Sequence, residues 1–132
     1  VPGIGFILAV VISQEIGAVE RFGGPEQLAS YAGTCPRVHQ SGEKARYGRQ
    51  RTDVNQYLKW AYSEAANIIA INRNRWSHKH AARLYNRLRQ RRGHGKAIGA
   101  VARHLAEASY WMLIRNEEYK EPVVRRGLPT AV

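Results

Sequence analysis

Apolar residues recur at intervals of three and four positions through most of the chain, which is the spacing of helices that each bury one face. The first such stretch covers residues 4–17 and is mostly apolar, so we expect a largely buried helix that ends at Gly17. Gly24 and Pro25 begin a short second helix, because proline suits the first helical turn, and Gly33 ends it.

A long helix is predicted further along, and we expect it to lie at the centre of the domain. Thr52 or Asp53 can cap its first turn, and it runs to about Asn72. Its expected buried face consists of Val54, Tyr57, Leu58, Ala61, Ala65, Ile68 and Ile69.

Two more helices complete the predicted domain, which spans residues 1–121 and is followed by an exposed tail, residues 122–132. Ser77 is the expected N-cap of the first, and the run Gly93-His94-Gly95 separates it from the second, residues 96–115. The expected apolar positions are Ala81, Leu84, Tyr85 and Leu88 in the first, and Ile98, Val101, Ala102, Leu105, Ala108, Ser109 and Met112 in the second.

The segment of residues 35–51 has no helical periodicity. The dipeptide Ser41-Gly42 favours a turn, and residues 37–40 and 45–47 flank it, so we predict a short, exposed β-hairpin. The expected fold class is therefore mainly α: a helical domain with a helix-hairpin-helix-like start and a small β-hairpin.

That start is the run of residues 1–5, Val-Pro-Gly-Ile-Gly, directly before the first apolar helix. It resembles the hairpin of a helix-hairpin-helix DNA-binding element. Gly3 and Gly5 would let the backbone approach a phosphate closely, and the free amides at a helix start receive the anion. A plain turn at the start of a helix is the alternative interpretation.

Composition places a strong positive charge on a folded domain. The 132 residues include 21 Lys and Arg against 10 Asp and Glu, for a net charge of +11, while 44% of residues are hydrophobic. A polyanion is the natural partner of such a surface. The longest apolar run, residues 4–12, is shorter than the roughly 20 residues of a membrane-spanning helix, so no membrane partner is expected.

Two further features of the sequence concern its setting. A single cysteine, Cys35, forms no internal disulfide and favours a reducing, cytoplasmic location. Because the sequence does not begin with methionine, we expect it to be a portion of a longer protein.

Basic residues gather in two places. No acidic residue occurs between Glu64 and Glu107, whereas ten Lys and Arg and four His do. One side of the predicted helix in this stretch is cationic, and its residues are Lys79, Arg83, Arg87 and Arg91. A second cluster surrounds the hairpin turn and consists of Arg37, Lys44, Arg46, Arg49 and Arg51. Two basic surfaces rich in arginine favour nucleic acid bound through its phosphates, and the alternative for each is a solvated charged face.

Aromatic and histidine residues are interleaved with these arginines. Tyr47 and Trp76 are candidates for contact with bases or sugars, whereas we expect Tyr57 to pack in the core. His78 and His80 stand two positions apart on different sides of a helix, which is poor geometry for a shared metal ion. No metal site is expected in this chain.

Ser41 is the candidate catalytic residue. A serine hydroxyl becomes nucleophilic only with a base, a metal or strong electrostatic stabilisation of the group that it attacks. His39 stands two residues before it, although a surface histidine is the favoured interpretation of that residue. Taken alone, Ser-Gly in a turn is usually only a turn.

A series of short motifs gives Ser41 its context. In order they are Pro2-Gly3-Ile4-Gly5, Glu15-Ile16-Gly17, Arg21-Phe22, Leu28-Ala29-Ser30-Tyr31-Ala32-Gly33, Pro36-Arg37, Gln40-Ser41-Gly42, Lys44, Arg46, Gly48-Arg49, Asn55-Gln56-Tyr57-Leu58 and Ala65-Ala66. The series resembles the C-terminal transposase domain of insertion-sequence recombinases related to the Piv DNA invertase. The resemblance is dense from Pro2 to about Asn67 and continues loosely to Leu113.

The resemblance implies an enzyme fragment in which Ser41 becomes covalently joined to DNA. It places a divalent metal, which we expect to be Mg²⁺, on four acidic residues of an N-terminal RuvC-like domain that this chain lacks. We therefore expect no cofactor in the fragment and no catalysis by the fragment alone. In the full-length protein the resemblance implies DNA and a guide (bridge) RNA as partners, and we expect a homo-oligomer.

The predicted function is thus the C-terminal part of a site-specific DNA transposase or recombinase. It would bind nucleic acid and supply a serine nucleophile for strand cleavage and rejoining. The alternative is a non-catalytic helix-hairpin-helix module that binds DNA or RNA.

Overall fold

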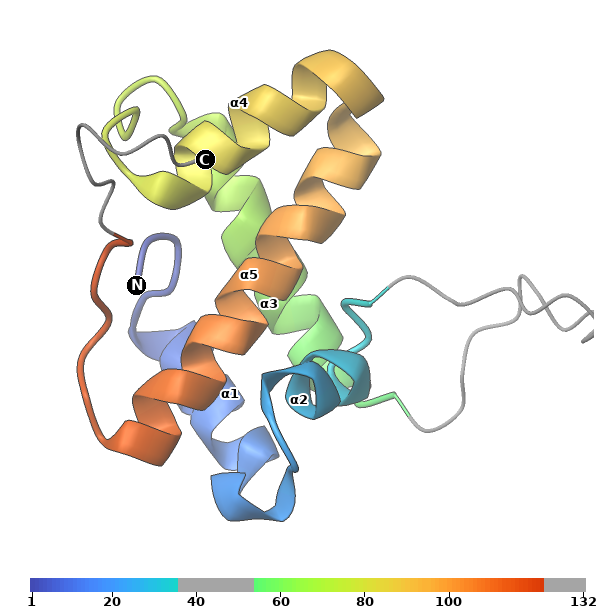
Figure 1. The fold of residues 1–132 in the computed structure, drawn as a ribbon, viewed down its shortest axis with the longest axis vertical. Coiled ribbons are helices and arrows are strands. Elements are labelled where there is room, and N and C mark those ends of the chain that lie inside the picture. The colour runs from blue at the N-terminus through green and yellow to red at the C-terminus, as the bar shows by residue number, and fades with distance from the viewer. Residues whose placement is uncertain (36–53, 123–132) are drawn as a thin grey trace, which may run out of the picture.

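The computed structural model describes residues 1–35 and 54–122, which fold into helices joined by short turns (Figure 1). The elements are α1 (Phe6–Ile16), the 3-10 turn η1 (Val19–Arg21), α2 (Pro25–Tyr31), α3 (Gln56–Ile71), α4 (His80–Arg92) and α5 (His94–Arg115). No strand occurs among the described residues, and the mainly α class is confirmed. The predicted β-hairpin, with Ser41 at its turn, lies outside the described residues.

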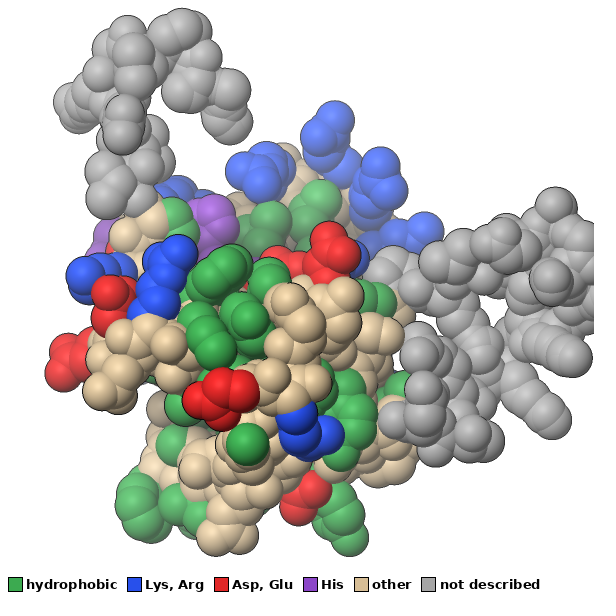
Figure 2. Space-filling model, turned by 60° about the horizontal axis from the view of Figure 1, so that its bottom comes forward, with side chains coloured by type: hydrophobic (Ala, Val, Ile, Leu, Met, Phe, Trp, Pro, Cys, Tyr) green, Lys and Arg blue, Asp and Glu red, His purple; other side chains and the backbone are tan. Residues whose placement is uncertain are grey.

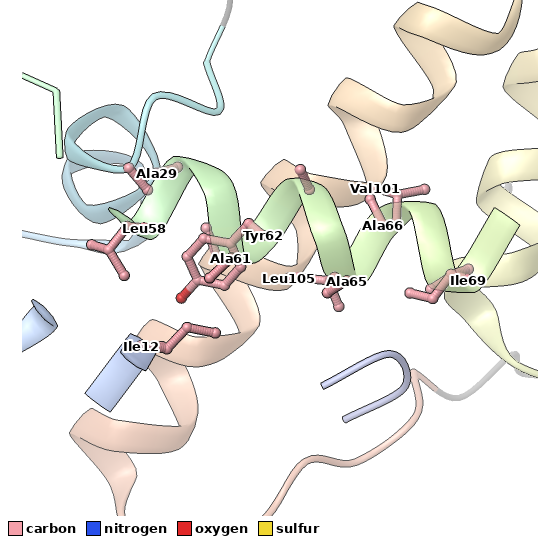
Figure 3. Close-up of a cluster of buried hydrophobic side chains, with 14 of the residues drawn as sticks. Ile12, Ala29, Leu58, Ala61, Tyr62, Ala65, Ala66, Ile69, Val101 and Leu105 are labelled. Atoms are coloured by element: carbon pink, nitrogen blue, oxygen red, sulfur yellow. The ribbon is translucent and has the colours of Figure 1, made fainter. Parts of the chain in front are cut away.

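Helices α3 and α5 form the centre of the domain. Helix α5 packs against α2, α3 and α4, while α1 packs against α3. Small side chains on α3 let the helices approach closely, and larger ones from α3 and α5 fill the space between them. The fully buried residues of this contact are Leu58, Ala61, Tyr62, Ala65, Ala66, Ile69, Val101 and Leu105 (Figure 3). The prediction of a long central helix is confirmed.

The buried face of α3 includes Tyr62, and Tyr57 lies outside it. Tyr62 is fully buried, whereas Tyr57 is 66% exposed, so the prediction that Tyr57 packs in the core is wrong. Tyr62 stands four residues after Leu58 and Tyr57 four residues before Ala61, so helical spacing to a buried residue alone admits either tyrosine. Burial raises the pKa of Tyr62 to about 12, and the neighbouring Ser109 hydroxyl has a smaller, opposite effect.

Helix α1 is buried along one side only, which corrects the prediction of a largely buried helix. Leu8, Ile12 and Ile16 are buried, because α3 covers that side. Phe6 and Ile7 are 82% and 71% exposed.

The start of α3 also differs from the prediction. Asn55 is the N-cap, where Thr52 or Asp53 was expected. The side-chain oxygen of Asn55, Oδ1, accepts a hydrogen bond from the backbone N–H of Leu58 at 2.9 Å. Helix α3 therefore begins at Gln56, two to three residues later than expected.

Helices α4 and α5 meet at a single residue. Gly93 adopts a φ of 93°, which favours glycine, and α5 begins at the next residue, His94, rather than at residue 96. At the other end of α4 the N-cap is Lys79, so the assignment of that role to Ser77 is wrong.

The chain turns back after α5 and returns towards α4 (Figure 1). Asn116 ends α5 in the left-handed region, with a φ of 55°. Oε1 of Glu121 then accepts a hydrogen bond from the backbone N–H of His80 at 2.8 Å. This carboxylate caps α4, which has no cap from a neighbouring side chain, and its charge is favourable at a helix start. Of the predicted tail, residues 123–132 lie outside the described residues.

Candidate nucleic-acid interface

The described part of the candidate interface is a row of arginines on α4. Arg83, Arg87 and Arg91 are all exposed and follow one another at intervals of four residues. Four residues advance a helix by about 6 Å, so the three guanidinium groups are spread along one side of α4. Lys79, the fourth predicted member of this face, is the half-buried N-cap.

Basic side chains gather at the end of the molecule that holds α4. Figure 2 shows Lys and Arg projecting from its upper part, where Figure 1 places the corner between α4 and α5. The side facing the viewer in Figure 2 carries hydrophobic and acidic side chains with fewer basic ones.

The charge of the α4 row is not neutralised by carboxylates within the described residues. Arg103 pairs with Glu107 at 2.9 Å, whereas Arg83 donates to the backbone carbonyl of His78 and carries its charge to the surface. Neither Arg87 nor Arg91 has an ion pair or hydrogen bond in the described ranges. Their positive charge is therefore available to an anion from solution.

Two histidines near this row belong to the helical body. The rings of His80 and His104 pack with their centroids 4.8 Å apart, and Nε2 of His104 lies 3.4 Å from the hydroxyl of Tyr119. Burial lowers the pKa of both imidazoles, with Arg83 acting further on His80, and His80 acting further on His104. Both are therefore mainly neutral at pH 7 and add no charge to the α4 row.

The described residues offer no alternative as a metal centre. No group of three or more His, Cys, Asp or Glu within residues 1–35 and 54–122 is placed to hold a metal ion. His78 is exposed in the turn before α4, while His80 faces His104.

Trp76, a predicted contact for bases or sugars, is partly buried against the hydrophobic core. Arg73, three residues earlier, also makes its contacts within the fold. Its guanidinium lies over the ring of Tyr85 and donates to the backbone carbonyl of Ala70 at 2.8 Å. The exposed aromatic residues of α3 are instead Tyr57 and Trp60, which are 66% and 50% exposed. Tyr47 lies outside the described residues.

The two glycines of the N-terminal turn have different surroundings. Gly3 has a φ of 82°, and a Cβ atom there would lie 2.6 Å from the carbonyl oxygen of Ala65 and 3.2 Å from Ile69. Gly5, the N-cap of α1, is exposed, and a Cβ there would meet nothing within 4 Å. Gly3 is explained by its contact with α3, whereas Gly5 faces open space at a helix start where an anion can approach.

The described chain on either side of the predicted hairpin segment, residues 35–51, meets the helices at one place, and Asn55 makes most of the hydrogen bonds there. The backbone N–H of Asn55 donates to the carbonyl of Tyr31 at 2.8 Å. Its side-chain Nδ2 donates to Oε1 of Glu15 at 2.9 Å and to the hydroxyl of Tyr31 at 3.2 Å. The hydrogen bond from Asn55 is the main cause of a lowered pKa at Tyr31. Helices α1, α2 and α3 are thereby tied together at a single side chain.

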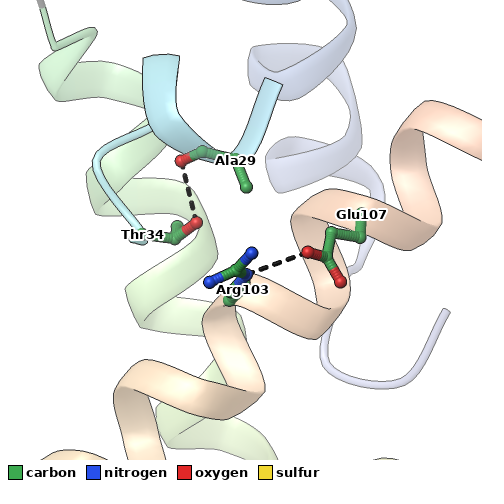
Figure 4. A network of polar contacts seen from close by, with 4 residues as sticks. All are labelled: Ala29, Thr34, Arg103 and Glu107. Atoms are coloured by element: carbon green, nitrogen blue, oxygen red, sulfur yellow. Dashed lines mark hydrogen bonds and ion pairs between the residues drawn. The ribbon is translucent and has the colours of Figure 1, made fainter. Parts of the chain in front are cut away.

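The preceding end of the segment is held beside this point. Gly33 has a φ of 72°, and a Cβ there would lie 2.6 Å from Cγ1 of Val54. Thr34 donates to the carbonyl of Ala29 from both its backbone N and its hydroxyl, at 3.0 and 2.9 Å (Figure 4). The chain therefore leaves α2 and rejoins α3 at neighbouring positions.

The residues carried between these two ends lie outside the described residues. They are the candidate nucleophile Ser41 and the basic residues Arg37, Lys44, Arg46, Arg49 and Arg51. Within the described part, Arg103 of α5 lies near the same place (Figure 4). Its hydrogen bond to Glu107 is the largest influence on its pKa and raises it, and Cys35 and Glu26 act in the same direction.

Sequence reasoning missed the residues that make these long-range contacts. Asn55 stands directly before the apolar run of α3, so its position was a signal for an N-cap. Glu121 caps α4 from 41 positions away, and no local pattern marks it.

The fold and the arginine row define a small helical domain with one strongly basic side. A family model described as the Transposase IS116/IS110/IS902 family matches residues 1–82, which include α1, α2 and α3. The chain belongs to this family of transposases.

Comparison with one relative shows how much of a transposase's length this chain covers. The chain is similar to the transposase for insertion sequence element IS1111A from Coxiella burnetii (strain RSA 493 / Nine Mile phase I), with 27% identity over 120 residues. The match covers 91% of this chain and 33% of the relative. The chain thus spans about a third of that transposase. No solved structure matches the chain.

The surroundings of the two N-terminal glycines predict different effects of adding a methyl group. Gly3→Ala introduces a contact with α3 and an unfavourable backbone conformation, so we expect the free energy of unfolding to fall by about 2 kcal/mol. Gly5→Ala is the matched control and should cost less than about 1 kcal/mol. Urea denaturation followed by circular dichroism measures both. Equal stability of the Gly3→Ala variant and the unaltered chain would contradict this account of Gly3.

Proposed function

We propose that this chain is the part of a DNA transposase that supplies the serine nucleophile and one of the surfaces that bind DNA. Membership of the transposase family over residues 1–82 carries the proposal, because this range includes Ser41 and its flanking basic residues. The exposed arginines of α4 support the DNA-binding part. In the full-length protein the proposal includes a homo-oligomer and a guide RNA, which follow from the resemblance.

In the proposed reaction the Oγ atom of Ser41 attacks a DNA phosphorus. A bond forms between Oγ and phosphorus as the bond to one strand's sugar oxygen breaks, and the serine proton is taken up so that the leaving strand ends in a hydroxyl. In rejoining, a strand hydroxyl attacks the same phosphorus and releases Ser41. Arg37, Lys44, Arg46 and Arg49 would neutralise the charge on the phosphate.

In this proposal a divalent metal ion would be held by another domain of the full-length protein and not by this chain. The resemblance implies Mg²⁺ held by four acidic residues of a RuvC-like domain. The described residues offer no cluster of ligands that fits such an ion. No step is therefore assigned to a metal in this chain.

The proposed role of α4 is to bind the DNA backbone. Each strand of duplex DNA carries one phosphate per about 3.4 Å of helix axis, so a row of arginines about 6 Å apart can reach several phosphates at once. The contacts would be independent of base sequence and sensitive to salt. A non-catalytic DNA- or RNA-binding module would share this property, so the serine must be tested separately.

Replacing the serine tests the catalytic part of the proposal. In the full-length protein, Ser41→Ala should abolish strand transfer and the covalent protein–DNA adduct while leaving DNA binding unchanged, because the side chain's proposed role is chemical. Ser77→Ala, which removes an exposed serine before α4, is the control and should recombine normally. An adduct in the unaltered protein that maps to Ser41 by mass spectrometry is the expected positive result. Normal strand transfer by the Ser41→Ala variant would leave the non-catalytic module as the function.

Replacing two arginines tests the α4 surface. Arg87→Ala combined with Arg91→Ala should weaken duplex binding and reduce the slope of log affinity against log salt by about 2, since each phosphate contact contributes roughly 0.9. Arg83→Ala with Arg87→Ala should act similarly. Arg115→Ala removes an exposed charge at the far end of α5 and serves as the control. Fluorescence anisotropy of a labelled duplex at several salt concentrations gives the slopes, and an unchanged slope would make the α4 row a solvated surface.

A further inference from the structure

Two large aromatic side chains stand exposed at the start of α3. Tyr57 and Trp60 are 66% and 50% exposed, although each carries a large ring that proteins usually bury in part. They are three positions apart on one helix, so their side chains are neighbours on its surface. Trp60 lies on the side of α3 opposite to the fully buried Leu58 and Tyr62, and Tyr57 lies between that side and the buried one. The core therefore does not account for either ring.

The helix that carries these rings is firmly placed. Tyr57 follows Asn55 by two residues, and the hydrogen bonds of Asn55 to Glu15 and Tyr31 fix the start of α3 against α1 and α2. Tyr and Trp side chains also have only two torsions each, so their rings lose little conformational entropy when a ligand stacks on them. The pair is therefore preorganised for a planar ligand.

The surroundings of the two rings distinguish the kind of ligand. The side chains next to the two rings on α3 are polar or charged: Gln56, Lys59, Ser63, the acidic Glu64 and Asn67. The nearest strongly exposed apolar side chain on this side of the helix is Ile71, three turns after Trp60. A protein partner anchored by apolar contacts would favour a continuous hydrophobic surface, such as the one that Phe6 and Ile7 begin on α1. Isolated aromatic rings among hydrogen-bonding groups suit nucleobases, which offer a flat face and a polar edge.

The charge of the chain favours the same ligand. The net charge of +11 attracts a polyanion, and the unpaired arginines of α4 show that this charge reaches the surface. In a duplex each base is covered by its neighbours, so an aromatic side chain reaches a base face only where the strand is unpaired or a base is extruded. A stacking platform therefore selects unpaired nucleotides.

We propose that Tyr57 and Trp60 form a stacking platform for one or two unpaired bases of a DNA strand. This inference rests on the DNA-binding part of the proposed function and adds the form of DNA that is bound. The α4 arginines would hold backbone phosphates irrespective of pairing, and the α3 rings would hold bases where the strands are separated.

Tryptophan fluorescence tests the platform directly. A variant of the 132-residue chain with Trp76→Phe and Trp111→Phe retains Trp60 as its tryptophan, since the sequence contains three. Single-stranded DNA of about 12 nucleotides should quench this fluorescence, because a stacked base quenches indole emission. A duplex of the same sequence should bind, as judged by anisotropy, with little quenching. Binding of the single strand without quenching would overturn the proposal.

Substitutions give the second measurement. Tyr57→Leu and Trp60→Leu keep apolar bulk and remove the ring, and each should weaken single-strand binding by about 5- to 100-fold while duplex affinity stays unchanged. The matched control is Trp111→Leu, since Trp111 is 42% exposed on α5 and is stacked with Arg115. Circular dichroism confirms that each variant is folded. Equal affinity of the Trp60→Leu variant and the unaltered chain for the single strand would also overturn the proposal.

The outcomes separate this proposal from the proposed function. If the α4 variants lose duplex affinity while the Tyr57 and Trp60 variants bind every strand normally, the platform alone fails. If the chain binds no DNA of either form, the DNA-binding proposal fails together with the platform. Tighter binding and stronger quenching with single-stranded RNA than with DNA of the same sequence would contradict the assignment to a DNA strand.

Discussion

The hydrogen bonds of Asn55 are the constraint on which the rest of this structure depends. Its backbone N–H, its side-chain amide and its side-chain oxygen bond to Tyr31, Glu15 and Leu58. One residue thus starts the central helix and fixes that helix against α1 and α2. Gly33, which follows α2, lies against Val54, so the described chain on either side of residues 36–53 meets at this place.

Packing of the core determines which surfaces remain for binding. Helix α3 uses one side for the core, where Tyr62 and several alanines lie against α5, and leaves Tyr57 and Trp60 outside. Helix α4 extends from the body at its corner with α5, so its arginines face solvent. The basic row and the aromatic pair therefore occupy different helices, and they suit different parts of a nucleic acid, its phosphates and its bases.

The sequence predicted the helices better than their ends or their partners. Periodicity located α1, α3, α4 and α5, because each buries a regular stripe, while Pro25 and Gly33 marked α2, and the arginine row of α4 followed from the same periodicity. The caps of α3 and α4 were misplaced because Asn55 and Glu121 are selected by tertiary contacts. Which of Tyr57 and Tyr62 is buried depends on the direction from which α5 approaches. The need for glycine at position 3 depends on the contact of this residue with Ala65 of α3. Ser41 lies outside the described residues, and its role remains a prediction.

The free energy of unfolding of two Asn55 variants tests the central claim most directly. Asn55→Ser keeps an N-cap oxygen for α3 but removes the donor to Glu15 and Tyr31. If Asn55 ties the three helices together, urea denaturation should show a loss of about 1–3 kcal/mol for Asn55→Ser and about 1 kcal/mol more for Asn55→Ala, which also lacks the cap. A Ser variant as stable as the unaltered chain would mean that Asn55 only caps α3, and would contradict the account.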